Sequence, residues 1–290
     1  MSIRKYIALL KSAELGSISL AAEQMGYTQP AVSKMITDLE TDWQVCLLRR
    51  NRSGVVPSSE CLQLMPILRA LAADCEALDF AVSEFHGAQT GLVRVGIFTS
   101  VADMWMPRLL RTFQEKYPNI DFDLINMDTY AEIESCIRQG KVDCGFVSLP
   151  AASDLDAHFL MRDELVAVLP ADHPLADAPF FPIQDLEGAP FIKLRETADY
   201  EISRFLEHIP YKPSIQYEVG SDHTILSMVE SGLGISITHS LIANNPRYEV
   251  THKCFDDGQY RDIAIATAKD ALLSGATRLF VDHVCGQFAE

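Results

Sequence analysis

The chain has 290 residues, 48% of them hydrophobic, so it is long enough for two or three domains with cores of their own. Its formal charge of −16 is uneven: residues 1–60 hold seven Lys or Arg and six Asp or Glu, whereas the rest hold 17 basic and 34 acidic residues. Because an acidic surface repels nucleic acid, DNA affinity would have to come from a local cluster. No run reaches the roughly 20 apolar residues of a membrane span. Charges at Arg4, Lys5 and Lys11 also exclude a signal peptide, so we expect a cytoplasmic protein without a membrane partner.

A first helix is expected over residues 4–15, and two short helices separated by a tight turn are expected between Ser17 and Glu40. Gly26 stands where a helix ends in a left-handed residue. Thr28 can cap the next helix, and Pro30 lies in its first turn, where a missing N–H costs nothing. This arrangement predicts a helix-turn-helix.

The second of these short helices has two distinct faces. Its apolar face carries Val32, Ile36 and Leu39, and its polar, nearly uncharged face carries Gln29, Ser33, Lys34 and Thr37. A face of this kind can hydrogen-bond base edges in the DNA major groove. Arg49, Arg50 and Arg52 follow in a segment typical of a wing between short strands. The alternatives are an ordinary helical hairpin and a solvated basic loop.

The next segment repeats apolar residues in steps of four and three, as in the seam of a two-stranded coiled coil. The seam residues are Leu64, Leu68, Leu71, Cys75, Leu78, Val82 and Phe85. We expect a dimerisation helix, the alternative being a helix packed on its own domain. Pro66 requires that this helix either begins near Met65 or bends there.

After a hinge at residues 87–92, strands and helices alternate, which predicts an α/β fold with a mostly parallel sheet. Strands are expected at Leu92–Phe98, Ile120–Asn126, Asp143–Ser148, Phe191–Lys193, Ile215–Val219 and Ile235–Thr238, and helices at Met104–Lys116, Tyr130–Gln139, Tyr200–Glu207, Thr224–Glu230 and Leu279–Phe288. Residues 261–267 should cross back from a second lobe to the first. Two such lobes make a fold of the periplasmic-binding-protein type.

The N-terminal segment resembles the winged helix of LysR-type transcriptional regulators. That family's Gly-Ser, Ala-Ala, Thr-Gln-Pro-Ala-Val-Ser and Leu-Glu stand in register at Gly16-Ser17, Ala21-Ala22, Thr28–Ser33 and Leu39-Glu40. The resemblance implies a winged helix-turn-helix DNA-binding domain at 1–60, a linker dimerisation helix at 61–88 and an effector-binding domain at 89–290. Within the last, lobe I would span about 89–162 and 265–290, and lobe II about 163–264.

The same resemblance implies the partners and the DNA contacts. It predicts a sequence-specific regulator of double-stranded promoter DNA with a dyad-symmetric site, a homodimer through the linker helix that assembles into a homotetramer, and RNA polymerase as a further partner. Gln29 is the candidate for adenine readout, and Thr28 and Arg52 are the candidates for phosphate contacts. The complete set of expected DNA contacts is Thr28, Gln29, Pro30, Ser33, Lys34, Arg50 and Arg52.

The sequence departs from the family pattern around the wing. It has Trp43-Gln44 where most relatives have Leu-Gly, and Leu47-Leu48 where they have Leu-Phe. Pro57-Ser58 replaces a Leu-Thr, and Cys61 replaces a glycine. Gln44 must therefore tolerate a turn that a glycine makes in other members.

A ligand is expected beyond the carboxyl ends of the strands, between the lobes. The expected effector residues are Thr99, Ser100, Met127, Asp128, Phe146, Ser148, Lys193, Arg195, His223 and Thr238. Lys193, Arg195 and His223 offer charge-assisted donors, which favours a small carboxylate, and Phe98 and Phe146 suggest an aromatic one. Asp103 and Asp128 would oppose an anion if they point inward. Lys193 and Arg195 have an alternative role, pairing with Glu196 and Asp199 on the surface.

No catalytic motif, metal-ligand spacing or cofactor motif is present. Gly232-Leu233-Gly234-Ile235 precedes a strand instead of following one, so it is not a dinucleotide loop. A solute-binding module of the same fold would have no use for residues 1–60, and an enzyme would need an acid–base or nucleophile constellation. The seven cysteines include no Cys-x-x-Cys. Cys136 and Cys144 could suggest a redox pair, but inert buried thiols are the expectation.

Overall fold

The computed structural model describes residues 2–51, 54–85, 89–195, 200–256, 258–269 and 271–289. The chain divides into two compact units. The first is Met1–Ala88 with the short segments 139–141 and 272–275, and the second is the rest. Each unit is described by itself. In the described residues, no helix is long and apolar enough to cross a membrane.

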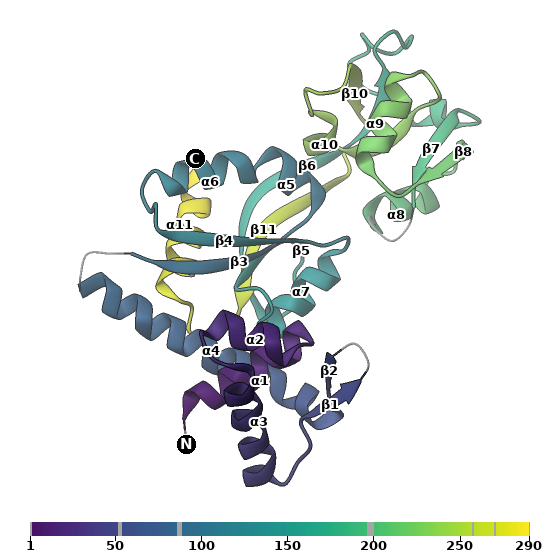
Figure 1. Ribbon diagram of the computed structural model, residues 1–290. Coiled ribbons are helices and arrows are strands. Elements are labelled where there is room, and N and C mark those ends of the chain that lie inside the picture. Colours follow the sequence, from purple (N-terminus) through teal and green to yellow (C-terminus); the bar gives the residue numbers. More distant parts are fainter. Residues whose placement is uncertain are drawn as a thin grey trace. The chain divides into compact units, whose positions relative to one another are not determined.

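The first unit contains a helix-turn-helix followed by a two-stranded wing and a long helix (Figure 1). The elements are α1 (Ile3–Leu15), α2 (Ile18–Met25), α3 (Gln29–Trp43), β1 (Leu48–Asn51), β2 (Gly54–Pro57) and α4 (Ser59–Phe85). Ser17 caps α2 by accepting a hydrogen bond from the Leu20 N–H, and Gly26 ends α2 with a φ of 68°. Thr28 occupies the N-cap position of α3, but its side chain makes no capping hydrogen bond.

The helices of the first unit close over a core that includes Leu9, Val32, Leu39 and Leu47, all fully buried. The turn after α3 is held by Glu40, whose Oε1 accepts hydrogen bonds from the N–H groups of Leu47 (2.8 Å) and Leu48 (3.1 Å). Leu39 and Glu40 therefore both stabilise this part of the fold. One residue supplies core volume, and the next satisfies two backbone donors at the entry to the wing.

The long helix α4 runs without interruption through Pro66. The helix begins at Ser59, well before Met65, so the expectation that Pro66 marks the start of the helix is wrong. Its first part belongs to the core of the unit, since Cys61, Met65 and Leu68 are buried. Further along, Leu78 is 65% exposed and Val82 is 46% exposed. Only the C-terminal part of the expected seam thus presents apolar side chains outward.

The second unit is built on a mixed sheet of seven strands with helices packed around it. Its strands are β3 (Gly91–Ile97), β4 (Ile120–Asn126), β5 (Cys144–Leu149), β6 (Leu155–Pro170), β9 (Ser236–His239), β10 (Val250–Cys254) and β11 (Tyr260–Ala268), and a separate pair is β7 (Pro190–Leu194) with β8 (Ser214–Val219). Its helices are α5 (Thr99–Met104), α6 (Met106–Gln114), α7 (Tyr130–Arg138), α8 (Tyr200–His208), α9 (Asp222–Glu230), α10 (Ser240–Ala243) and α11 (Gly275–Phe288), with a 3-10 turn η1 (Ile183–Leu186).

The sheet is less parallel than the sequence suggests. Strand β3 pairs in parallel with β4 and β5, and β7 with β8, but β6 and β11 run antiparallel to each other and to their other neighbours. Figure 1 shows these two long strands passing from one lobe to the other. The expected lobe boundaries near 163 and 264 fall inside them and remain predictions. Strand β10 and helices α5 and α10 were not anticipated.

Candidate DNA-reading and effector sites

The outer face of α3 presents the residues expected to read DNA. Gln29, Pro30 and Lys34 are exposed, and Ser33 is half-buried. Thr37 is also exposed, but its hydroxyl donates to the Ser33 carbonyl at 3.0 Å. The opposite face of α3 is fixed by burial of Val32, Ile36 and Leu39, so the polar face is held outward by packing.

The wing places part of the basic cluster on its first strand. Arg49 and Arg50 are exposed on β1, where Arg50 stands opposite Val55 of β2. Arg52 lies outside the described residues. The wing is anchored by a hydrogen bond of 2.8 Å from the Val55 N–H to the Gly16 carbonyl at the end of α1. At the neighbouring Gly54, with φ of 142°, a Cβ would lie 2.2 Å from the same carbonyl oxygen, so only glycine fits.

A small cavity, which we call the first cavity, lies between the two lobes of the second unit and measures about 100 Å³. Five of the ten expected effector residues line it: Thr99, Ser100, Met127, Asp128 and Thr238. It is also lined by residues outside that set of ten: Phe98, Tyr130, Leu194, Gly220, Ser221, Asp222, His239, Ile242 and Arg261. The carboxyl ends of β3 and β4 and the N-terminal ends of α5, α7 and α9 supply most of these side chains, as expected for an open α/β sheet.

Arg261 is the cation of this cavity, and its guanidinium is held on several sides. It pairs with Asp163 through Nε (3.0 Å) and Nη2 (2.7 Å), and both residues are buried. Nη2 also donates to Ser100 Oγ at 2.8 Å, and Nη1 donates to the Tyr130 hydroxyl. The attraction in a buried ion pair offsets the cost of desolvation only when further hydrogen bonds satisfy both partners, and both Arg261 and Asp163 make such bonds.

Asp163 extends the same network into the second lobe. Its Oδ1 accepts from Ser240 Oγ (2.8 Å) and from the Leu241 N–H (2.9 Å) at the start of α10. Arg261 and Asp163 stand opposite each other on β11 and β6, the two strands that connect the lobes. A continuous chain of polar contacts therefore joins Ser100 in one lobe to α10 in the other.

The remaining expected effector residues do not line the first cavity. Phe146 is fully buried and packs against Trp105. Ser148 donates from Oγ to Glu201 Oε1 at 3.1 Å. Lys193 is half-buried on β7, and Arg195 is exposed, with its N–H bonded to the Val219 carbonyl at 2.7 Å. Their alternative partners, Glu196 and Asp199, lie outside the described residues.

His223 instead bridges the two lobes. Its Nε2 lies 2.7 Å from Asp103 Oδ2 on α5, and its Nδ1 lies 3.0 Å from the Tyr248 hydroxyl. The Asp103 contact is at ion-pair distance but does not have hydrogen-bond geometry, whereas Nδ1 and the Tyr248 hydroxyl are within hydrogen-bonding distance. Asp103 was expected to repel a bound anion if it pointed into the ligand site. Its carboxylate instead lies against the His223 imidazole.

The cysteines are free thiols, and in three of them the reactive thiolate is disfavoured. Burial raises the pKa of Cys144 well above its usual value, and the neighbouring Asp143 adds to that shift. A hydrogen bond to Glu164 and burial raise the pKa of Cys254 to about 11. Burial, assisted by Glu40, raises the pKa of Cys61 to about 11. Since the thiolate is the reactive form, these three groups are poorly suited to redox sensing.

Comparisons with known proteins match both units. Residues 3–62 match the family model of the bacterial regulatory helix-turn-helix protein of the lysR family, and residues 86–289 match that of the LysR substrate binding domain. The chain is 27% identical over 289 residues to the uncharacterized HTH-type transcriptional regulator YvbU of Bacillus subtilis, with 97% of each chain covered.

Two solved structures share the fold. CbnR, solved at full length with its target DNA, has a TM-score of 0.66 at 19% identity and covers 100% of both chains. The effector binding domain of QuiR, solved with shikimate, has a TM-score of 0.59 at 24% identity and covers 69% of this chain and 97% of that one. The chain is thus a member of the LysR family of DNA-binding transcriptional regulators, a regulator with an effector-binding domain and not an enzyme.

Proposed function

We propose that the protein regulates transcription in the cytoplasm by placing two copies of α3 in successive major grooves of a dyad-symmetric promoter site. The observation that carries this proposal is the exposed, nearly uncharged face of α3, with Gln29 and Lys34 at its N-terminal end. Gln29 would read adenine through a bidentate contact, while Lys34 and the wing would bind phosphates. CbnR, which shares the fold, was solved on its target DNA.

The winged helix-turn-helix domains of the two subunits would be joined through α4. Leu78 and Val82 are exposed apolar residues four positions apart on the expected seam. Pairing with the same helix of a second copy would bury them. A dimer of this kind presents two equivalent reading helices, which is why we expect dyad symmetry in the DNA. Two dimers would make the homotetramer.

The effector that fits the first cavity best is a small carboxylate that also carries hydroxyl or ammonium groups. Ser100, Tyr130 and Arg261 form one side, where hydrogen-bond donors face the cavity and a carboxylate is stabilised. Asp128 and Asp222 line the same cavity and would repel a simple anion, but they would accept hydrogen bonds from donors on the ligand. QuiR, a structural neighbour, was solved with shikimate.

DNA recognition is tested with the full-length protein and the DNA upstream of its own gene. Fluorescence anisotropy should show tighter binding to this fragment than to a random duplex of equal length. Gln29→Ala should change the relative affinity for variant sites, because removing a base contact costs about 1–3 kcal/mol at one position only. Equal affinity for promoter and random DNA, with candidate metabolites present, would refute the proposal.

Effector binding is tested by calorimetric titration of the full-length protein with D-glycerate, L-serine and glycerol. The two carboxylates should bind more tightly than glycerol, which has the hydroxyl groups alone. Ser100→Ala should weaken carboxylate binding about tenfold or more, since it removes a hydrogen bond to a charged group. Ser231→Ala, at the exposed end of α9, serves as the matched control. Binding of glycerol alone would contradict a carboxylate effector.

A further inference from the structure

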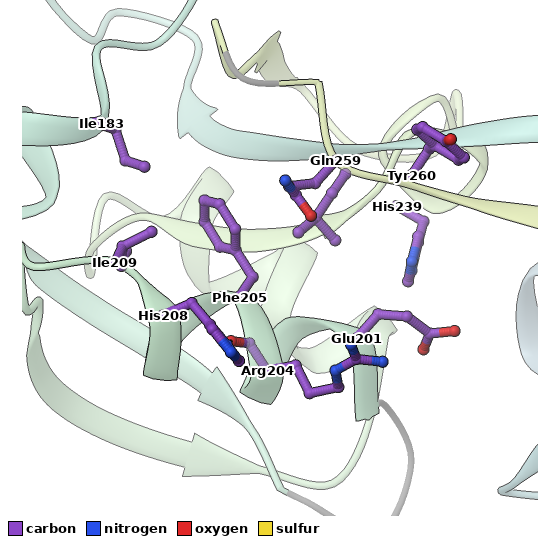
Figure 2. A pocket seen from close by; sticks show the side chains of 10 residues that line it. Ile183, Glu201, Arg204, Phe205, His208, Ile209, His239, Gln259 and Tyr260 are labelled. Atoms are coloured by element: carbon purple, nitrogen blue, oxygen red, sulfur yellow. The ribbon is translucent and has the colours of Figure 1, made fainter.

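A second, larger cavity lies within the second lobe beside the strands that connect the lobes, and it measures about 470 Å³ (Figure 2). This volume is within the range of roughly 300–1,000 Å³ that small-molecule sites occupy. Its lining residues come from α8, η1, β9 and the lobe-connecting segments, and none comes from the β3–α7 region of the first lobe. His239 is shared with the first cavity.

One end of this second cavity is apolar. Leu165, Phe205 and Ile209 are buried at 2%, 7% and 7% exposure, and Ile183 of η1 completes the surface. Figure 2 shows the Phe205 ring in the middle of the cavity wall, with Ile209 and Ile183 beside it. A hydrocarbon or aromatic group of a ligand would be removed from water there, which is the main source of affinity for small molecules.

The other end of the second cavity is polar and arises from the helical repeat of α8. Glu201, Arg204 and His208 recur at intervals of three and four, so they line the cavity from one face of the helix. Gln259 and His239 lie across from them in Figure 2. Glu201 Oε1 accepts a hydrogen bond from Ser148 at 3.1 Å, and Arg204 brings to the cavity a guanidinium, a group that binds carboxylates.

We infer that this second cavity is a binding site for an apolar monocarboxylate, with the hydrocarbon part on Phe205 and the carboxylate at Arg204. The site is separate from the proposed effector site and does not depend on it. It would influence that site because His239 lines both cavities, and because Tyr260, which lines the second cavity, precedes Arg261 of the first. If a ligand in the second cavity favours one arrangement of these residues, it changes the affinity of the first cavity for its own ligand. By linkage, the ligand of the first cavity then changes the affinity of the second cavity by the same factor.

The test uses 3-phenylpropionate as the probe and calorimetric titration of the full-length protein. Saturable binding should appear below about 10 mM, the range expected for a ligand of this size. The neutral amide, 3-phenylpropanamide, and the cation, 3-phenylpropylamine, report on the charge. Each should bind at least about tenfold more weakly, since a charge-assisted hydrogen bond is lost. An amine that binds as well as the acid would overturn the assignment.

Two variants locate the probe. Arg204→Gln should weaken 3-phenylpropionate about tenfold, and Gln259→Trp should fill the polar end and abolish binding. Both residues are exposed, so the fold should survive, which circular dichroism checks. Ser231→Ala, at the exposed end of α9 and outside both cavities, should leave the probe's affinity unchanged, and Arg247→Gln on the exposed surface is the charge control. Absence of saturable binding in the wild type, or an affinity that Arg204→Gln leaves unchanged, refutes this site.

Discussion

Gln44 is a residue in a backbone conformation that its side chain disfavours. With a φ of 55° and ψ of 38° it ends α3 in the left-handed region, and it is the only non-glycine with positive φ among the described residues. The left-handed conformation costs an ordinary residue about 1–2 kcal/mol, whereas glycine adopts it cheaply. The fold keeps the turn because Glu40 binds the N–H groups that follow it.

We predict that Gln44→Gly raises the free energy of unfolding of the first unit by about 1 kcal/mol. Chemical denaturation followed by Trp43 fluorescence, in a Trp105→Phe background, isolates this unit. Gln63→Gly, at an exposed position inside α4, is the control and should instead lower stability by about 1 kcal/mol. If Gln44→Gly is less stable than the wild type, as Gln63→Gly should be, the prediction is wrong, and the Gln44 side chain contributes more than its backbone strain costs.

Arg261 and Asp163 illustrate the cost of burying charge. Asp163 is fully buried and Arg261 is 6% exposed. We predict that Arg261→Gln destabilises the second unit by about 3–5 kcal/mol, because it leaves the Asp163 carboxylate without its cation. The double variant Asp163→Asn with Arg261→Gln should be more stable than the single one, since it removes both charges. Denaturation followed by Trp105 fluorescence, with Trp43→Phe, measures this, and additive losses would contradict it.

At the scale of elements, most helices and strands follow from local pattern, because apolar periodicity and glycine positions are visible in the sequence. Strand β10 and helix α10 escaped prediction because each is only four or five residues long and is specified by pairing or capping from distant residues. Asp163, for example, supplies the cap of α10 from 78 positions away in sequence. Local patterns carry no information on such contacts.

Half of the residues expected to bind an effector line the first cavity, and the others could not be placed for the same reason. Residues directly after β3 and β4 line it, as the topology requires. From the sequence, Lys193 and Arg195 were expected to supply the positive charge beside the ligand, but the arginine that lines the cavity is Arg261. The available signal was a charged residue in otherwise apolar strands: Arg261 precedes the buried Ile263–Ala266, and Asp163 precedes Leu165–Leu169. Buried charges in strands require partners, so each should have indicated the other.

The long helix α4 combines two tasks along its length. Its first half packs on the winged helix, and its second half leaves Leu78 and Val82 exposed. We predict that Leu78→Glu lowers the apparent mass from dimer or tetramer toward monomer in sedimentation velocity, because two carboxylates would face each other across the seam. Ile67→Glu is the control, since Ile67 is equally exposed, at 67%, but lies off the seam. If both variants keep the wild-type mass, α4 is not the dimer interface.

At the scale of the whole molecule, charge is separated along the chain. Residues 1–60 carry a slight basic excess, whereas the remainder holds 34 acidic and 17 basic residues. Under the proposed function, repulsion would keep the acidic effector-binding domain away from phosphates and so limit contact with DNA to α3 and the wing. Binding should therefore depend on salt through few contacts, each releasing about 0.9 counterions from the duplex.

Because the phosphate contacts are few, the loss of a single lysine should change the salt dependence of DNA binding measurably. We predict that Lys34→Gln weakens binding to all DNA sequences and reduces the slope of log K against log salt by about 0.9 per subunit, or about two for a dimer. Lys11→Gln is the matched control, because Lys11 lies on α1 and its Nζ donates to Gln24 at 3.3 Å. It should leave the slope unchanged. Anisotropy titrations from about 50 to 200 mM salt provide the slopes. A Lys34→Gln slope equal to that of the wild type would place the exposed face of α3 away from the phosphates, and the major-groove orientation proposed for this helix would have to be abandoned.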